Sequence, residues 1–160
     1  MSNGKNFNSA FKWIINILRI HHVPFQISGG LAARAYGSKR KLYDIDIDIP
    51  DRLLHKLVLK VKPYIIFGPI RFKDQWWDLK LMTLKYRRQR IDISGANQAK
   101  IYNKIRKNWV SLKSNLSNPS YKKIARLKVP VIPKRELIYY KRILSRQADI
   151  SDIEQITRSS

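Results

Sequence analysis

The strongest constraint on the fold is the strict alternation of aspartate and isoleucine in YDIDIDIP, residues 43–50. Alternate residues of a β-strand point to the same face of a sheet, whereas a helix would distribute them around its surface. Asp44, Asp46 and Asp48 therefore share one face of a predicted strand, and the three isoleucines share the other. We expect the isoleucine face to pack on a hydrophobic core and the carboxylates to line the opposite face.

Three carboxylates on one strand face are unusual in a chain with 11 acidic residues against 33 Lys and Arg. Neighbouring members of such a row lie roughly 6.5–7 Å apart along the strand. Like charges raise one another's pKa and oppose folding unless a cation lies between them. A solvated strand face with ordinary surface aspartates is the alternative, although Asp is depleted in strands. The row favours a site for Mg²⁺ or Mn²⁺, because hard cations are held by carboxylates together with substrate phosphates.

Asp92 lies between Ile91 and Ile93 in the segment RIDIS, which is a second apolar strand with one acid. Taken alone, it would be an ordinary surface acid. If its strand neighbours the first, Asp92 completes a cluster of at least three carboxylates. Two metal ions in such a cluster clamp the attacking and leaving oxygens of a phosphoryl displacement. The third carboxylate is placed to take the proton from an attacking hydroxyl group.

Ser28, Gly29 and Gly30 join a predicted strand to a predicted helix. Glycine lets the backbone approach a phosphate closely, and the first N–H groups of a helix attract anions. An ordinary turn is the alternative, because a pair of glycines is common. Next to the aspartate strand, the segment is a candidate phosphate cradle.

The order of predicted elements gives an α/β (α+β) protein with a mixed β-sheet and helices packed on it. We predict a single domain over residues 1–160, with core motifs in 24–96, a basic helical segment in 97–128 and C-terminal helices in 134–157. Predicted helices cover 6–21, 51–61, 97–116, 136–144 and a last stretch from Asp149 or Ser151 to Ile156; predicted strands cover 23–28, 43–49, 64–72, 76–86, 90–95 and 126–133.

The formal net charge of +22 favours an anionic partner, and nucleic acid is the leading one. High solubility alone is the other explanation of this charge. Residues 100–128 carry basic and aromatic side chains without one acid, which is typical of an RNA-binding surface but also of a solvated helix face. The candidate RNA-binding residues are Lys100, Lys104, Arg106, Lys107, Trp109, Lys122, Lys123 and Arg126. Trp76 and Trp77 are candidates for stacking on bases, although one of the two is expected in the core.

Cysteine is absent, so disulfides and thiolate metal sites are excluded. No apolar run is long enough to span a bilayer, and the N-terminus does not have the pattern of a signal peptide. We therefore expect a cytoplasmic protein that does not act at a membrane.

The stretch GGLAARAYGSKRKLYDID, residues 29–46, resembles the DNA polymerase β-type nucleotidyltransferase superfamily. That superfamily has a pair of glycines, a short helix, a glycine, an arginine and then Asp-x-Asp. The spacing from Arg40 to Asp44 is similar to that of a subgroup of small bacterial enzymes, the AbiEii/MenT-like nucleotidyltransferases. The C-terminal stretch VPVIPKRELIYYKRILSRQADISDIEQI, residues 129–156, resembles the closing segment of the same subgroup. The resemblance implies the minimal nucleotidyltransferase fold.

The resemblance also implies roles for individual residues. Asp44 and Asp46 would be the metal-binding catalytic pair, and Asp92 the third metal-binding carboxylate and base. Nucleotide binding would involve Ser28, Gly29, Gly30, Arg40, Lys141, Asp149 and Asp152. Asp149 and Asp152 would orient Lys141 or Arg146, or cap the last helix. Asp48 lies outside the core pair. Leu42 stands where relatives often have a small hydroxyl residue, so a hydrogen bond is missing there.

The implied activity is a metal-dependent transfer of a nucleoside monophosphate from ATP or another NTP to a hydroxyl acceptor, with release of pyrophosphate. The charge favours an RNA acceptor such as the 3′ end of tRNA, and the subgroup includes toxins that are restrained by a partner antitoxin. Transfer to a small molecule or to a protein hydroxyl is one alternative. A catalytically inactive RNA-binding module is another. The acceptor, the preferred NTP and the oligomeric state are left open.

Overall fold

The computed structural model of the protein describes residues 2–112, 114 and 116–159, in which helices and strands alternate up to α3, strands β3 to β9 then follow one another, and two helices come last. The helices are α1 (Ser2–Ile20), α2 (Gly29–Ala35), α3 (Leu54–Val61), α4 (Lys134–Leu144) and α5 (Gln147–Arg158), with 3₁₀ turns η1 (Asp51–Leu53) and η2 (Lys62–Tyr64). The strands are β1 (Gln26–Ile27), β2 (Asp44–Ile49), β3 (Ile65–Lys73), β4 (Trp77–Tyr86), β5 (Gln89–Gly95), β6 (Ala99–Asn103), β7 (Asn108–Leu112), β8 (Ser120–Ile124) and β9 (Leu127–Val131).

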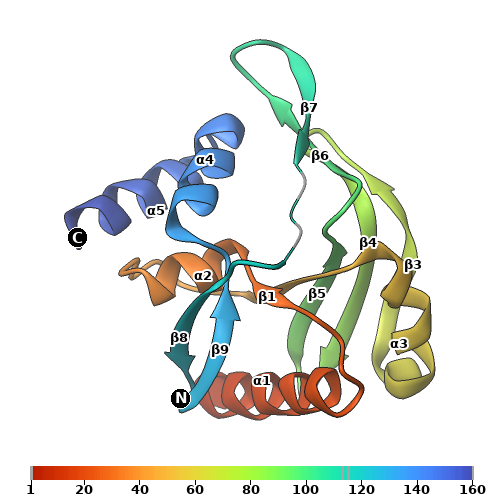
Figure 1. The fold of residues 1–160 in the computed structure, drawn as a ribbon. Coiled ribbons are helices and arrows are strands. Elements are labelled where there is room, and N and C mark those ends of the chain that lie inside the picture. The colour runs from red at the N-terminus through yellow and green to blue at the C-terminus, as the bar shows by residue number, and fades with distance from the viewer. Residues whose placement is uncertain (1, 113, 115, 160) are drawn as a thin grey trace.

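The strands pair in the order β7–β6–β4–β5–β2–β1–β9–β8, and β3 pairs with β4 outside this path. β2 is parallel to β5 and antiparallel to β1, so the sheet is mixed. The sheet curls so that the β6–β7 hairpin stands at the top of Figure 1 and the β8–β9 hairpin at the bottom. This architecture confirms the predicted α+β class.

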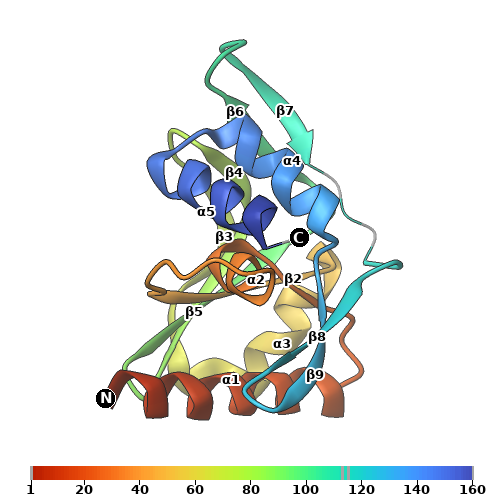
Figure 2. The same ribbon diagram turned by 90° about the vertical axis from the view of Figure 1, so that its left-hand side faces the viewer.

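The isoleucine face of β2 lies in the main hydrophobic core, as the alternation predicts. All three isoleucines are fully buried, and α1 adds Phe11, Ile14 and Leu18 to the same cluster. α1 and α3 both contact β5. In Figure 2, α4 and α5 lie above α2, while α1 and the β8–β9 hairpin lie below it. The helices thus leave the opposite face of β2 free to line a cleft.

The prediction of a basic helical segment over 97–128 is wrong, because these residues contain strands β6, β7 and β8 and the start of β9. Ala99 and Ile101 alternate with exposed residues and are buried, and Ile101 pairs with Trp77 of β4. The side-chain oxygen of Asn103 accepts hydrogen bonds from the N–H groups of Ile105 and Arg106, which closes the hairpin turn. Apolar residues here follow period two, and pairing with β4 overrides helix propensity.

Across the described ranges, 2–112, 114 and 116–159, no helix is long and apolar enough to cross a membrane.

Candidate active site

The carboxylates of β2 line a cleft of about 780 Å³ that opens between the sheet and helices α2 and α4. Asp44, Asp46 and Asp48 are each partly exposed to it, whereas the residues between them are buried. The period-two pattern of the sequence therefore produces one acidic row on the floor of the cleft.

β5 brings a fourth carboxylate to the same floor. It lies beside β2 in parallel register, with Asp92 directly opposite Asp46 and Arg90 opposite Asp44. Neighbouring strands lie about 4.8 Å apart, so Asp92 is closer to Asp46 than the next aspartate along β2. The hydroxyl of Thr83 on β4 donates a hydrogen bond of 2.7 Å to Oδ1 of Asp92 and orients this carboxylate. The structure thus places Asp44, Asp46 and Asp92 together, as the strand pattern predicts.

Arg90 supplies a positive charge within the cluster. Its Nε lies 3.3 Å from Oδ1 of Asp92 and 3.8 Å from Oδ1 of Asp44. The side chain is half exposed, so it is free to move when another cation or a phosphate arrives. No feature of the sequence singled out this residue, because its position beside Asp44 depends on the pairing of β2 with β5.

The surroundings of Asp44 and Asp46 disfavour several negative charges at once and raise the pKa of both carboxyl groups. Burial, followed by the charges of Asp92, Asp44 and Asp48, raises the pKa of Asp46 to about 7. Burial and the Asp92 charge also raise the pKa of Asp44, while Arg90 lowers it. In the absence of a further cation, the carboxyl group of Asp46 is protonated at neutral pH to a greater extent than an ordinary aspartate is.

Asp48 has different surroundings from the other two members of the row. Its oxygens accept hydrogen bonds from Nε2 of Gln26 at 3.0 Å and from the hydroxyl of Ser28 at 3.1 Å. Burial raises its pKa to about 6, and these hydrogen bonds counteract part of the rise. Asp48 therefore anchors β1 and the loop before α2. The hydroxyl of Ser28, predicted to contact a nucleotide, is already bound to it.

Gly29 begins α2 in a backbone conformation that favours glycine, with φ of +59°. A Cβ atom at this position would lie 2.2 Å from Oδ2 of Asp46, so only glycine permits this close approach. The N–H of Gly29 donates a hydrogen bond of 2.8 Å to the hydroxyl of Tyr140. A Cβ at Gly30 would lie 2.7 Å from Nη2 of Arg40. The two glycines thus let the start of α2 lie against the acidic row and a guanidinium.

Replacing Gly29 with Ala is expected to lower the free energy of unfolding by about 2 kcal/mol, because the positive φ and the contact with Asp46 both become strained. Urea denaturation in EDTA measures this change without any contribution from bound metal. Gly4→Ala is the matched control, because no atom lies within 4 Å of the added Cβ. Equal stabilities of the two variants would contradict the tight packing of Gly29 on Asp46.

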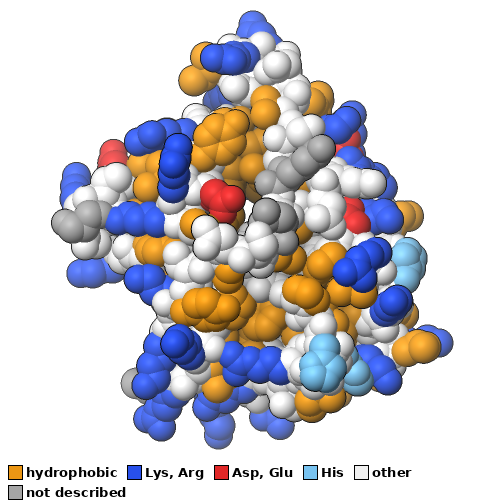
Figure 3. Space-filling view, in the orientation of Figure 1, with side chains coloured by type: hydrophobic (Ala, Val, Ile, Leu, Met, Phe, Trp, Pro, Cys, Tyr) orange, Lys and Arg blue, Asp and Glu red, His pale blue; other side chains and the backbone are white. Residues whose placement is uncertain are grey.

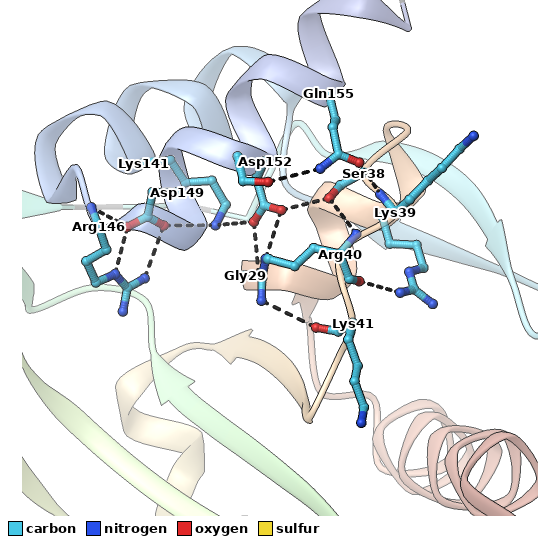
Figure 4. Close-up of polar contacts among 12 residues, drawn as sticks. Gly29, Ser38, Lys39, Arg40, Lys41, Lys141, Arg146, Asp149, Asp152 and Gln155 are labelled. Carbon is cyan, nitrogen blue, oxygen red and sulfur yellow. Dashed lines mark hydrogen bonds and ion pairs between the residues drawn. The ribbon is translucent and has the colours of Figure 1, made fainter.

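A network of buried ion pairs connects α4 and α5 to the segment between α2 and β2 (Figure 4). Nζ of Lys141 lies 3.1 Å from Oδ1 of Asp149 and 3.0 Å from Oδ2 of Asp152. Nε and Nη2 of Arg40 donate to the two oxygens of Asp152, each at 3.0 Å. Burial alone would raise the pKa of Asp152, but hydrogen bonds from Arg40 and Ser38 lower it below its ordinary value.

Asp149 has both of the structural roles that the sequence left open. It accepts from the backbone N–H of Arg146 and caps α5, and it also accepts from the Arg146 side chain at 2.7 Å. Lys141 is only 2% exposed and is held by two carboxylates, although it lines the cleft. The predicted contact of Lys141 with nucleotide phosphates stays a prediction.

Aromatic and basic side chains form one wall of the cleft. Trp76 and Trp77 both line it, and the guanidinium of Arg146 lies 5.5 Å and 6.0 Å from their ring centroids. Trp77 also meets Tyr140 edge to face at 5.9 Å. Both tryptophans pack against the main hydrophobic core, in line with the expectation for one of them, but both keep part of their surface exposed to the cleft. This wall offers flat surfaces on which a nucleobase can stack.

The residues predicted to bind RNA fall into two groups, and none of them lies on a helix. Lys100, Lys104, Arg106, Lys107 and Trp109 lie on the β6–β7 hairpin, and Lys122, Lys123 and Arg126 lie on the β8–β9 hairpin. The two hairpins stand at opposite ends of the molecule in Figures 1 and 2. The ring of Trp109 is covered by the ammonium group of Lys73 at 4.9 Å.

The donor atoms at the cleft floor suit a hard divalent cation. Among the described residues, no group of three or more His, Cys, Asp or Glu side chains is already arranged around a metal position. Mg²⁺ nevertheless needs only one or two carboxylates when a substrate's phosphates complete its ligands. Asp44 and Asp46 are oxygen donors with raised pKa values, which a bound cation would bring down. Their chemistry therefore fits Mg²⁺ or Mn²⁺ better than a softer metal.

Several residues of the site could not be found by sequence reasoning. Arg90, Thr83 and Tyr140 contact Asp92 or Gly29 only because strands and helices far apart in the chain meet there. Gln26 had a weak signal, since it is a polar residue in an otherwise apolar strand segment. The sequence predicts Arg146 only as a partner of Asp149 and Asp152, whereas in the structure it also lines the cleft beside Trp76.

No protein-family model and no curated protein sequence matches the chain. Three solved structures are similar in fold. One is a Thermotoga maritima protein provisionally assigned as a nucleotidyltransferase, with a TM-score of 0.72 and 12% identity over 96% of this chain and 94% of that one. The second is the lincosamide antibiotic adenylyltransferase LnuA with lincomycin bound, with a TM-score of 0.62 and 17% identity over 94% and 96%.

The third is the antibiotic-resistance factor ANT(2″)-Ia, with a TM-score of 0.64 and 16% identity over 99% of this chain and 85% of that one. At these identities the likeness establishes the fold alone. The chain has the mixed α+β fold of these nucleotidyltransferase structures, and the likeness extends over almost its whole length.

Proposed function

We propose that the protein is a metal-dependent nucleotidyltransferase, which transfers a nucleoside monophosphate from an NTP to a hydroxyl acceptor. The observation that supports it best is the parallel register of β2 and β5, which sets Asp92 opposite Asp46 beside Asp44 on the cleft floor. Gly29 lets the start of α2 lie against Asp46, which supports a phosphate position beside the carboxylates. The fold shared with adenylyltransferases agrees with this chemistry.

The reaction joins an acceptor oxygen to the α-phosphorus of the NTP and breaks the bond from that phosphorus to the bridging oxygen of pyrophosphate. Asp44 and Asp46 would hold Mg²⁺ or Mn²⁺, which when bound neutralises the phosphates and stabilises the leaving group. Asp92, oriented by Thr83, accepts the proton of the attacking hydroxyl. Nε of Arg90 lies within 3.8 Å of two carboxylates. When the NTP binds, the Arg90 side chain would leave these carboxylates and contact a phosphate of the NTP. Trp76 and Arg146 line the space that would hold the base of the NTP.

RNA is the acceptor that the charge of the molecule favours. The net charge is +22, and a protein of this charge attracts a polyanion strongly. We include in this proposal the 3′ end of tRNA as the attacking hydroxyl and a toxin-like role restrained by a partner protein. Both follow from the resemblance of residues 29–46 and 129–156 to the AbiEii/MenT-like subgroup.

A small hydroxylated molecule is the second candidate acceptor. It is favoured by the likeness in fold to LnuA, whose structure has lincomycin bound. The likeness covers 94% of this chain and 96% of LnuA. In that case the aromatic wall at Trp76 and Trp77 would contact the acceptor rather than a base.

Incubation with each of the four α-³²P-labelled NTPs, Mg²⁺ and total tRNA is expected to label the RNA. Labelling should stop when EDTA is added or when Asp44 is replaced with Ala, because the metal-binding pair is then lost. If no NTP labels RNA but one labels a lincosamide or another hydroxylated antibiotic, the second acceptor is correct. If nothing is labelled and Mg²⁺ with NTP gives no thermal stabilisation, the protein is not a functional transferase, because a bound ligand must raise the stability of the native state.

A further inference from the structure

A second cavity of about 810 Å³ lies between the turn of the β6–β7 hairpin and one face of α4. The hairpin lines it with Asn103, Ile105 and Arg106, and α4 lines it with Lys134, Arg135, Ile138, Tyr139, Arg142 and Ile143. Residues 135, 138, 139 and 142 are spaced at i, i+3, i+4 and i+7, so they form one stripe along the helix. The residues of α4 that face the core, such as Leu137 and Leu144, form a different stripe. We call this cavity the α4 groove.

The α4 groove is positively charged. Four of its lining residues are Lys or Arg, and none of those within the described ranges is Asp or Glu. In the part of the chain that the structure describes, the side chains of Arg106, Arg135 and Arg142 form no ion pair with a carboxylate. These arginines are exposed and retain their full capacity to bind an anion.

The groove also exposes apolar and aromatic surface next to these charges. Ile105 is 81% exposed and Tyr139 is 54% exposed, so both side chains offer contact surface to a ligand in the groove. Figure 3 shows hydrophobic side chains at the surface below the β6–β7 hairpin, with Lys and Arg side chains beside them. Cations that bind a phosphate backbone and an aromatic ring that stacks on bases are the combination found in sites for single-stranded nucleic acid.

Tyr139 connects the α4 groove to the active site, because it lines both the groove and the cleft of the aspartates. A chain lying in the groove therefore reaches the catalytic carboxylates past the Tyr139 ring. The bases of an unpaired strand can splay out and stack on an aromatic ring such as Tyr139, whereas paired bases stay stacked within their duplex. The position of Tyr139 accordingly favours a single strand with its reactive end in the cleft.

We propose that the α4 groove binds the unpaired 3′ segment of the acceptor RNA, with Arg106, Arg135 and Arg142 on its phosphates and Tyr139 stacked on a base near the reactive end. This inference rests on the proposed function for its choice of acceptor. It assigns RNA contacts to α4, a helix that the sequence indicated only as a source of nucleotide-binding residues. The β8–β9 hairpin lies too far away to contribute to this segment (Figure 1).

The test measures binding of a 5′-fluorescein-labelled 12-nucleotide RNA to the full chain by anisotropy, in EDTA and without NTP. The double variant Arg135→Glu/Arg142→Glu is expected to bind at least about twentyfold more weakly, and its salt slope is expected to fall by about 1.4 because about 0.7 is lost for each phosphate contact. Lys56→Glu/Lys60→Glu on α3 makes the same change of charge on exposed residues away from the groove and should cost less than about threefold.

Tyr139→Ala is expected to weaken binding about tenfold, whereas Tyr139→Phe should bind like the parent because stacking needs only the ring. An RNA with 4-thiouridine at its 3′ terminus should photo-crosslink to α4. Equal losses in the α3 and α4 double variants would overturn the proposal, since long-range charge alone would then explain them. Tighter binding of a 12-residue polyglutamate peptide than of RNA would also overturn it, in favour of an acidic protein segment as the occupant.

The experiments distinguish failure of the proposed RNA binding in the α4 groove from failure of the proposed nucleotidyl transfer. Binding is measured without NTP or metal, so the inference stands if the groove variants lose RNA while no transfer is found with any acceptor. If RNA is labelled at equal rates by the parent and by Arg135→Glu/Arg142→Glu, the proposed function stands and the α4 groove does not bind the acceptor.

Discussion

Replacing Asp46 with Asn is expected to lower the rate of nucleotidyl transfer by a factor on the order of 10³, because one of the two carboxylates that we propose to hold the metal is lost. Asp48→Asn makes the same substitution two residues along the same strand and is the matched control. Asp48 is bound to Gln26 and Ser28, so its replacement should change the rate by less than about tenfold. Steady-state kinetics with labelled NTP measures both variants. Equal losses would show that Asp46 has no special role.

The same Asp46→Asn variant is expected to be more stable than the parent in the absence of metal. The pKa of Asp46 is about 7 in the folded protein, above its ordinary value of 3.8. The native state therefore binds more protons than the unfolded state between about pH 4 and 7, and the stability of the parent falls as the pH rises through this window. Asn cannot ionise, so the variant avoids this loss.

The stability advantage of Asp46→Asn should be about 2 kcal/mol larger at pH 8 than at pH 5, allowing for the partial exposure of the carboxylate. Urea denaturation in EDTA at the two pH values measures this difference. Adding Mg²⁺ with a non-hydrolysable NTP should then stabilise the parent at pH 8 and leave the variant nearly unchanged. A variant that is less stable than the parent at pH 8 would contradict the mutual repulsion of the carboxylates.

Replacing Lys141 with Met is expected to lower the free energy of unfolding by about 3 kcal/mol, because two buried carboxylates lose their shared cation. Asp149 and Asp152 are fully buried, and Nζ of Lys141 lies within 3.1 Å of both. Met is similar in length and keeps the packing of the aliphatic part of the side chain. Each carboxylate retains one arginine, which limits the loss.

Arg142→Met is the control for Lys141→Met, because Arg142 is the next residue on the same helix and is exposed. It should change the free energy of unfolding by less than about 0.5 kcal/mol. Urea denaturation at pH 7 compares the two variants. Similar small losses in both would mean that the Lys141 network adds little to stability. A large loss specific to Lys141 would show that this network holds α4 and α5 against Arg40 and the glycine side of the cleft.

The two sequence blocks that resemble nucleotidyltransferases correspond to the two structural units that enclose the cleft. Residues 29–46 form α2 and the start of β2, and residues 129–156 form the end of β9, α4 and most of α5. These two blocks can be recognised from the sequence because their features are local: a glycine pair, an alternating strand and acids spaced along one helix. Asp149 and Asp152 are three residues apart, so one helix face carries both toward Lys141.

Long-range pairing accounts for the features that were missed. Residues 97–116 have helix-forming lysines and leucines, but the pairing of Ile101 with Trp77 places this segment in the sheet. Arg90 is an ordinary basic residue in the sequence and becomes part of the acidic cluster only through the register of β5 on β2. The basic residues of 97–128, predicted to form a basic helical segment, are separated onto two distant hairpins for the same reason.

Period-two alternation was enough to predict the directions of Asp44, Asp46 and Asp92 and the burial of the isoleucines between the aspartates. The direction of a side chain within one strand or helix depends only on the backbone geometry of that element. The distances between charges, the raised pKa of Asp46 and the groove that shares Tyr139 with the cleft arise from elements far apart in the chain. Such contacts depend on strand pairing and helix packing, which are set by the burial of the whole core rather than by any single segment.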